Sequence, residues 1–285
     1  MVTKNNHWKI KGHTLIKHRI VGGYINACAI FDKRYHNAAY IDTHGGSGKV
    51  LNLTDGILID GSPLLASKIG MCHIIEANKK RVNLLRRYTQ NYENITIHNG
   101  DCNDLIFDVL ETIPQQKFIF CLIDPNGFVF KKGKETKMQL RAETIDAIAK
   151  HPRTEMLLNF MVSGCLRIIP WILEKKIDDY VTPLFGTEKW KEKWETLQNN
   201  EFKRYDTFKN LLIDERLRDY YDFIEWIPIN AKNGVPIYYL IYATNNKIGY
   251  KIMQNIFEKE KKIIPISSTI KDNIKMNYHL DNWGI

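Results

Sequence analysis

The sequence has no apolar run close to the ~20 consecutive residues that a membrane-spanning helix requires. The basic N-terminal residues, MVTKNNHWKIKGH, are not followed by the apolar core of a secretion signal. We therefore expect a cytoplasmic protein without membrane contact.

Cysteine is scarce and scattered: five residues in 285, with no CxxC pair. An odd count without paired spacing argues against a disulfide framework and against a zinc site. We expect no bound metal, and reduced cysteines at positions Cys28, Cys72, Cys102, Cys121 and Cys165.

Internal repeats and low-complexity tracts are also absent. The remaining composition, 44% hydrophobic and 26% charged, is that of an ordinary globular protein. The net charge is +9. A basic surface of this size is compatible with nucleic-acid binding, although many basic proteins bind none.

Apolar strands alternate with helices over residues 38–164, which predicts a mostly parallel sheet covered on both faces. A helix over residues 13–32 within the segment 1–37 comes first, and residues 49–61 are expected to form a loop. The expected strands are 39–42, 71–76, 95–101, 117–124 and 155–162.

The alternation of strands and helices ends after residue 164. Residues 165–220 are helical in character and predict an insertion, whereas 223–229 and 236–244 predict an antiparallel hairpin with a tight turn at Asn233-Gly234. Residues 221–263 would complete the core, and 264–285 would form a tail. This outline is that of the Rossmann-like class I methyltransferase fold, with strand order 3-2-1-4-5-7-6.

Asp42 ends the first strand and is followed by three glycines in four positions, Gly45, Gly46 and Gly48. Without Cβ atoms, the backbone of such a turn can approach a ligand closely. A carboxylate here suits the cationic amino-acid end of S-adenosylmethionine and would repel a pyrophosphate. An ordinary structural turn explains the same glycines.

Acidic residues also end the next two strands, where ligands of such sheets bind. Glu76 can accept hydrogen bonds from both hydroxyls of a ribose, and Asp101 can accept one from an adenine amino group. Cys102 offers a backbone N–H and an apolar wall. The alternatives are a solvated acid at 76 and a helix cap at 101.

The fourth strand ends in Asp124-Pro125-Asn126, where a substrate would meet the methyl group. The Asp124 carboxylate and the Pro125 carbonyl can accept hydrogen bonds from an amine, with Asn126 as an additional contact. Methyl transfer then depends mainly on positioning. A plain Asp-Pro turn is the competing interpretation.

With these motifs in place, the chain resembles the three-Cys-motif partner (TcmP) family, related to class I methyltransferases. The matching stretches are YIDTHGGSG (40–48), GSPLLA (61–66), the Glu76 strand, GDCN (100–103), LIDPNGF (122–128) and YYLIYATNNKIGYKIM (238–253). The resemblance implies S-adenosylmethionine binding and a role beside a three-Cys-motif protein. This chain carries Asn126 where relatives have an aromatic residue.

A basic stretch follows this motif directly, with five basic residues against one acidic residue from Lys131 to Arg141. It could hold a phosphate backbone, or it could be a solvated surface loop. The candidate substrate-binding residues are Phe128, which could stack on a base, and the cations Lys131, Lys132 and Lys134.

The sequence therefore predicts an S-adenosylmethionine-dependent methyltransferase that acts on a base nitrogen of RNA or DNA. The alternative is a methyltransferase-like subunit without catalytic activity, working beside a partner in a defence or modification system. A methyltransferase for small molecules is a third reading, which the basic stretch makes less attractive.

Overall fold

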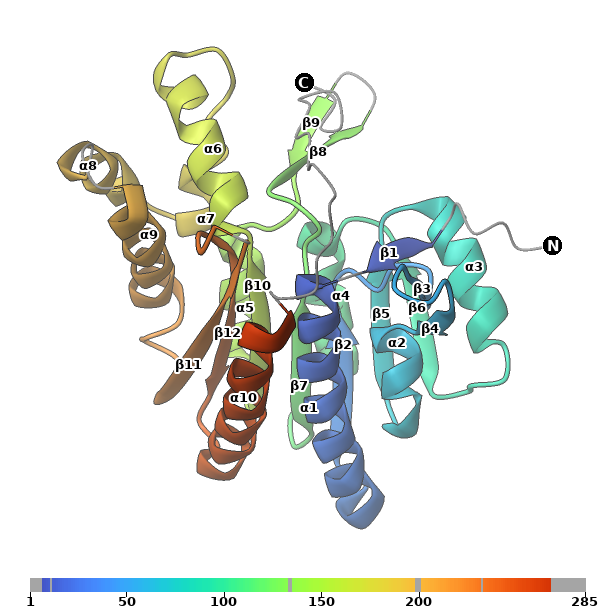
Figure 1. Cartoon of the computed structure of the whole chain (residues 1–285). Coiled ribbons are helices and arrows are strands. Elements are labelled where there is room, and N and C mark those ends of the chain that lie inside the picture. The colour runs from blue at the N-terminus through green and yellow to red at the C-terminus, as the bar shows by residue number, and fades with distance from the viewer. Residues whose placement is uncertain (1–6, 11, 133–134, 198–200, 232, 268–285) are drawn as a thin grey trace.

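A seven-stranded sheet forms the centre of the computed structural model (Figure 1), which describes residues 7–10, 12–132, 135–197, 201–231 and 233–267. Its strands in spatial order are β11 (Phe223–Asn230), β12 (Pro236–Thr244), β10 (Thr154–Phe160), β7 (Phe118–Ile123), β2 (Ala38–Asp42), β5 (Cys72–Glu76) and β6 (Ile95–Asn99).

The strand order confirms the predicted class I methyltransferase topology. Numbered along the chain within this sheet, the order read from β6 is 3-2-1-4-5-7-6. Only β12 runs against its neighbours: it is antiparallel to both β10 and β11, whereas the other pairs are parallel. The fold is therefore α/β, with a mostly parallel sheet and an antiparallel hairpin at one edge.

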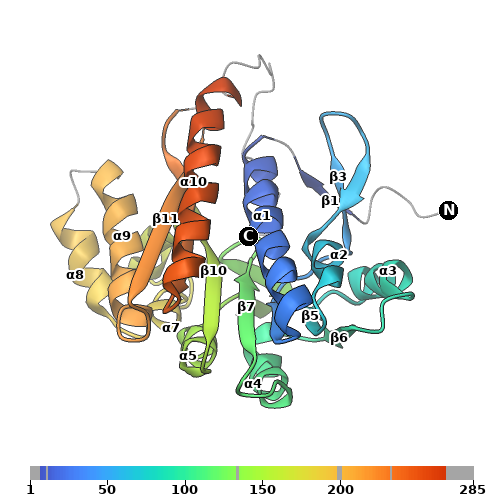
Figure 2. The same cartoon turned by 90° about the horizontal axis from the view of Figure 1, so that it is seen from below.

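Helices cover both faces of this sheet (Figure 2), as expected from strands that are apolar on both sides. One face carries α1 (His13–Tyr35), α2 (Ser62–Leu65), α3 (Lys79–Thr89) and α10 (Lys247–Ser267). The other carries α4 (Cys102–Thr112), α5 (Ala142–Lys150), α6 (Val162–Leu173), α7 (Thr182–Phe185), α8 (Lys189–Thr196) and α9 (Glu201–Arg216).

The predicted loop at 49–61 is wrong, because this stretch contains two strands. β3 (Lys49–Asn52) pairs antiparallel with β4 (Leu58–Asp60) and parallel with β1 (Trp8–Ile10), which was not predicted either. These strands are only three or four residues long, and β1 lies about forty positions before its partner. Local periodicity cannot reveal such a pairing.

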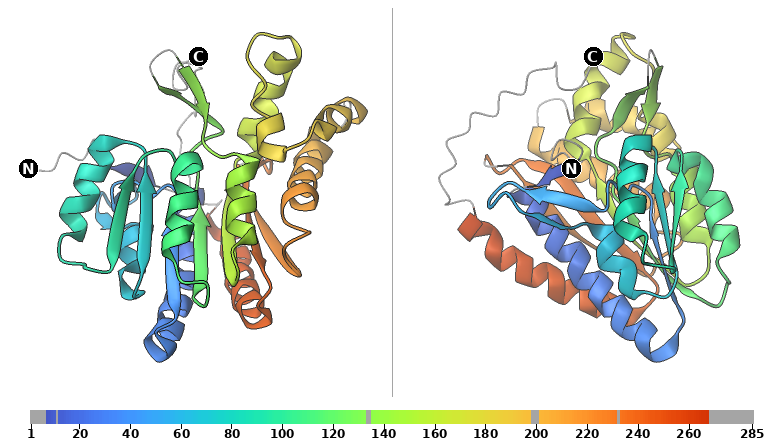
Figure 3. Two further views of the ribbon diagram at one scale, coloured as in Figure 1. Left: turned by 180° about the vertical axis from the view of Figure 1, so that it is seen from behind. Right: turned by 90° about the vertical axis from the view of Figure 1, so that its right-hand side faces the viewer.

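The basic stretch also has structure. β8 (Val129–Lys132) and β9 (Glu135–Met138) pair antiparallel, with Lys131 opposite Thr136. This hairpin stands away from the sheet at the edge where the parallel strands end, next to α6 (Figure 3). Lys134 lies outside the described residues.

The helical character of 165–220 is seen in α6–α9, and Trp190 is fully buried there. At the end of the chain, α10 continues to Ser267, so the first residues of the predicted tail 264–285 are helical. Residues 268–285 are outside the described part. Within the described residues, no helix has the length and apolarity to cross a bilayer.

Candidate functional site

A cleft of about 240 Å³ opens at the carboxyl ends of the parallel strands. The glycine turn after β2 and the Asp124–Asn126 turn after β7 form its floor, and the N-terminal segment and the start of β12 close its sides. Of the predicted site residues, the structure brings six to this cleft: Gly45, Gly46, Gly48, Asp124, Pro125 and Asn126.

The glycine turn is constrained by its surroundings. Gly46 and Gly48 have positive φ angles of 66° and 83°, which favour glycine. A Cβ at Gly45 would lie 2.1 Å from the Ile74 side chain. The turn therefore needs glycine for close packing as well as for any ligand, and both interpretations of the motif remain compatible with it.

Asp42 lies behind the turn and is completely buried. Its oxygens accept hydrogen bonds from the Ser62 hydroxyl (2.6 Å), the His44 backbone N–H (3.0 Å) and the Tyr40 hydroxyl (3.1 Å). Burial raises the pKa of Asp42 to about 6, and these hydrogen bonds oppose the shift. The carboxylate thus supports the turn, and its contact with a cofactor stays a prediction.

Ser62 opens α2 without capping it. The cap position of α2 is Gly61, and no side chain caps this helix. The Ser62 hydroxyl instead donates to Asp42, so the GSPLLA motif is tied to the glycine turn.

Glu76 is also occupied by protein groups. Its carboxylate accepts the N–H of Gly46 at 2.9 Å and that of Asn78 at 2.7 Å. The ring of Trp8 lies beside Gly46, since a Cβ there would be 3.2 Å from it, and Arg81 stacks on Trp8 at 3.9 Å. Glu76 does not line the cleft, and its contact with a ribose stays a prediction.

Asp101, which follows the third predicted strand, caps the N-terminus of α4. The Asp101 side chain accepts the N–H of Asn103 at the start of α4, at 3.0 Å. Cys102 is buried, with its sulfur 3.7 Å from Nε2 of His44. Burial lowers the pKa of His44 to about 4, so this imidazole is neutral at physiological pH. Asp101 and Cys102 do not line the cleft.

The richest polar cluster surrounds Asp124. The ammonium of Lys17 donates to both carboxylate oxygens, at 2.7 and 2.8 Å. Asn159, at the end of β10, donates through Nδ2 to Asp124 Oδ1 at 2.7 Å and to the Pro125 carbonyl at 3.4 Å. The buried Oδ1 of Asn159 accepts no hydrogen bond from any residue that the structure describes. This oxygen can therefore accept a hydrogen bond from a ligand in the cleft, which Asn159 lines.

The remaining predicted residues are placed differently. Asn126 lines the cleft, and its backbone N–H donates to the Gln139 side chain. Phe128 is buried in the hydrophobic cluster on the α4–α9 face, so it packs the core here, and its stacking role stays a prediction. Lys131 and Lys132 lie on β8, next to the cleft along the chain.

Sequence reasoning missed Lys17, Asn159 and Trp8, all of which line the cleft. Asn159 had a signal, because it is the one uncharged polar residue in the otherwise apolar run MLLNFMV at a strand end. Lys17 lies 107 positions from Asp124, so only the fold reveals this pair. The buried Nε1 of Trp8 has no hydrogen-bond partner in the described part of the chain.

No protein-family model matches the chain, and no curated protein matches its sequence. Solved structures do resemble it. Protein LPL1258 from Legionella pneumophila has 11% sequence identity and a TM-score of 0.51, covering 87% of this chain and 91% of that protein. Human methyltransferase-like protein 13 in complex with S-adenosylhomocysteine has 10% identity and a TM-score of 0.44, covering 96% and 99%.

At such identities the likeness to LPL1258 shows the fold alone. The resemblance to the three-Cys-motif partner family consequently rests on the sequence motifs. The class I methyltransferase fold is identified by the strand order of the sheet.

Proposed function

We propose that this chain is an S-adenosylmethionine-dependent methyltransferase that acts on a base nitrogen of nucleic acid. The observation that carries the proposal is the acceptor group at the ends of β7 and β10. Asn159 Oδ1, the Pro125 carbonyl and the Asp124 carboxylate converge beside the glycine turn, where this fold places the reacting groups.

The cleft suits the cofactor in its chemistry. Bare backbone at Gly45, Gly46 and Gly48 would receive the amino-acid end, with Asp42 behind it, and Glu76 and Asp101 would take the ribose and adenine. The volume of about 240 Å³ is below the ~300–1,000 Å³ of small-molecule sites. Trp8 and β1 must therefore move aside.

S-adenosylmethionine, when bound, supplies an electrophilic methyl group. The chain's own residues then position the acceptor nitrogen: Asn159 Oδ1 and the Pro125 carbonyl accept its N–H groups and direct its lone pair. Asp124 holds Asn159 in place through the 2.7 Å hydrogen bond. Lys17 occupies both Asp124 oxygens, so an amine that uses Asp124 displaces the ammonium. Positioning of this kind accounts for most of such a reaction.

Nucleic acid is supported as the substrate by the basic β8–β9 hairpin, which continues directly from the Asp124 turn. Five basic residues against one acidic residue lie between Lys131 and Arg141, and they would hold phosphates while a base enters the cleft. The net charge of +9 favours the same partner.

The test begins with isothermal titration of the purified chain with S-adenosylmethionine and S-adenosylhomocysteine. We expect both to bind. Transfer of a radiolabelled methyl group to RNA and to DNA would then identify the substrate. A folded sample that binds neither compound contradicts the proposal.

A second candidate function has its own support: a methyltransferase-like subunit without activity, working beside a three-Cys-motif protein. Glu76 already accepts two backbone N–H groups, β1 covers Gly46, and Asn126 replaces the aromatic residue of the resembling family. Filter binding of nucleic acid with and without the partner separates the two. Binding that requires the partner, with no methyl transfer, favours the subunit.

A further inference from the structure

A cavity larger than the cleft lies at the opposite end of the strands from the proposed active site. Its volume is about 560 Å³, within the range of small-molecule sites. The amino ends of β7 and β10, the end of β12, the last half of α1 and the start of α10 enclose it. The stretch YYLIYATNNKIGYKIM (238–253) contributes Thr244, Asn246 and Gly249 to its lining, but none of the predicted site residues lies there.

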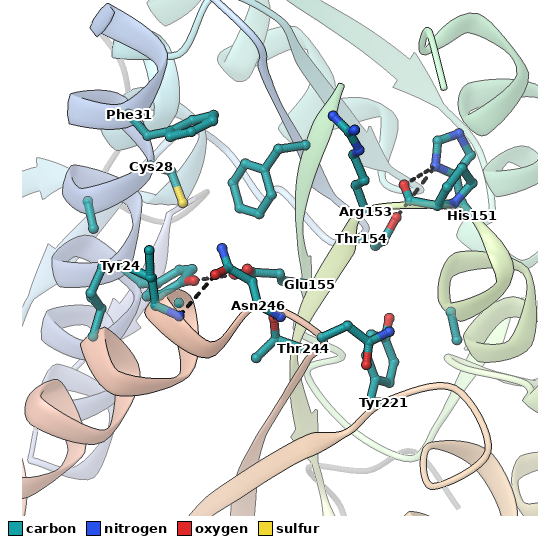
Figure 4. A pocket seen from close by; sticks show the side chains of 18 of the residues that line it. Tyr24, Cys28, Phe31, His151, Arg153, Thr154, Glu155, Tyr221, Thr244 and Asn246 are labelled. Atoms are coloured by element: carbon teal, nitrogen blue, oxygen red, sulfur yellow. Dashed lines mark hydrogen bonds between the residues drawn. The ribbon is translucent and has the colours of Figure 1, made fainter. Parts of the chain in front are cut away.

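Its floor holds a buried carboxylate whose two oxygens have different surroundings. Glu155 of β10 is 2% exposed, and its Oε2 accepts hydrogen bonds from the hydroxyls of Tyr24 and Tyr242. Its other oxygen, Oε1, is buried and accepts none from the described residues. Figure 4 shows Glu155 and Tyr24 joined by their hydrogen bond on the cavity floor.

A second buried polar atom on the cavity wall is unpaired within the described residues, the hydroxyl of Tyr221. Leaving buried hydrogen-bonding groups unpaired is costly, so two at one cavity point to a ligand that pairs with them. Gly249 of α10 packs directly on this carboxylate, because a Cβ there would lie 2.6 Å from Oε1.

The walls of the cavity are apolar and its mouth is cationic, unlike the acidic floor. Phe31, Phe118 and Ile248 contribute apolar surface, and Ile248 is 71% exposed at the rim. Lys150 and Arg153 line the cavity and are exposed, so cations surround its entrance. The cavity thus presents an inner acceptor, an apolar middle and a cationic entrance.

We propose that this cavity is a second ligand site, which takes a nucleoside monophosphate whose base carries an amino group. The amino group donates to Glu155 Oε1, the base and ribose lie between the apolar walls, and the phosphate meets Lys150 and Arg153. The site is separate from the proposed active site and does not depend on methyl transfer.

The first experiment titrates the whole chain at pH about 8, where carboxyl groups are ordinarily ionised, with four nucleotides in two matched pairs. Adenosine and cytidine monophosphate carry the amino group, whereas inosine and uridine monophosphate carry a carbonyl oxygen in its place. We expect the amino-bearing member of each pair to bind at least about tenfold more tightly. Equal affinities within both pairs, or no binding of any nucleotide, overturn the proposal.

The second experiment uses Glu155→Gln. Tyr24 and Tyr242 would donate to the amide oxygen, which leaves the NH2 group facing the cavity, so the preference should reverse toward inosine and uridine monophosphate. Tyr221→Phe removes only a hydroxyl. It should weaken nucleotide binding while the fold persists, and it serves if Glu155→Gln does not fold.

Glu76→Ala is the control for binding in the cleft at the other edge. It should leave nucleotide affinity unchanged, because Glu76 belongs to the proposed cofactor site. Nucleotide binding that is lost in Glu76→Ala and kept in Tyr221→Phe overturns the proposal and assigns the nucleotide to that cleft.

Discussion

The two edges of the parallel sheet differ in how their acidic side chains are used. At the carboxyl edge, Asp42, Glu76 and Asp124 all accept hydrogen bonds from protein groups, and the cleft is small. At the amino edge, Glu155 has a buried oxygen without a described partner beside a cavity more than twice as large. The strand topology thus predicts a ligand site at the carboxyl edge, whereas side-chain packing leaves the larger cavity at the amino edge.

The difference also separates two kinds of binding. For the proposed cofactor to bind at the carboxyl edge, existing hydrogen bonds would have to be exchanged for those of the ligand, and β1 would have to move. A ligand at the amino edge would instead meet two buried polar atoms that have no partner among the described residues, Glu155 Oε1 and the Tyr221 hydroxyl, in a larger cavity. We expect slower and more selective binding at the first edge than at the second.

The largest effect is expected from Asp124→Ala, which breaks the carboxyl edge alone. Loss of the carboxylate releases Asn159 and Lys17, so turnover should fall by at least about 1,000-fold while cofactor affinity is kept. Single-turnover methyl transfer and calorimetry measure the two quantities. Asp108→Ala, on the exposed side of α4, is the matched control and should be neutral. Unchanged turnover in Asp124→Ala would remove Asp124 from the mechanism.

Asp42→Ala should abolish detectable cofactor binding, a loss of at least about 100-fold. It removes the negative charge behind the glycine turn and leaves the Ser62 hydroxyl and the His44 N–H unpaired. Calorimetry with the folded variant measures the cofactor affinity. In the wild type, binding should also weaken as the pH falls below about 6, because Asp42 then takes up a proton. Normal cofactor affinity in Asp42→Ala would show that the proposed pocket is wrong.

Asp42→Asn tests how much the buried charge of Asp42 lowers the free energy of unfolding. Because burial raises the folded-state pKa to about 6, the native protein holds this proton more tightly than the unfolded chain does. The wild type should therefore lose stability relative to the variant as the pH rises from about 4 to above 6. The expected change is about 3 kcal/mol, from about two pKa units. Denaturant unfolding at both pH values measures it, and a constant difference would contradict the shifted pKa.

Trp8→Ala would make the carboxyl edge more like the amino edge. Without the indole beside Gly46, the cleft opens, and cofactor affinity should rise by about tenfold because no ring has to be displaced. Leu53→Ala, an exposed residue at the end of the small sheet, is the control. Weaker binding in Trp8→Ala would instead show that the indole contacts the cofactor directly.

The central sheet could be predicted because each of its strands is recognisable from its own residues. Residues such as Ile74 and Leu157 lie in apolar runs flanked by helices, and the hairpin has Asn233-Gly234 at its turn, where Gly234 has a φ of 82°. β1, β3 and β4 were missed because their few residues gain stability only from each other. That pairing joins Trp8 to Val50 across the chain.

The sequence predicts the strand ends that form the candidate site, but not the surroundings of their side chains. Asp42, Glu76 and Asp124 lie at the expected strand ends, yet their hydrogen-bond partners come from elsewhere in the chain. Lys17 reaches Asp124 because α1 packs on the sheet, and the cavity at Glu155 exists because α1 and α10 leave room there. Such features depend on how helices approach one another, and no local pattern encodes that.

The contact between α1 and α10 has a consequence for synthesis of the chain. Arg19 and Glu260 form a salt bridge across 241 positions, and the two helices lie side by side over the same face of the sheet (Figure 2). On the ribosome, α10 emerges only after α1 and all seven strands of the sheet have been made. The surface of α1 that contacts α10 therefore stays exposed during synthesis of the whole sheet, and chaperones can bind it in that interval.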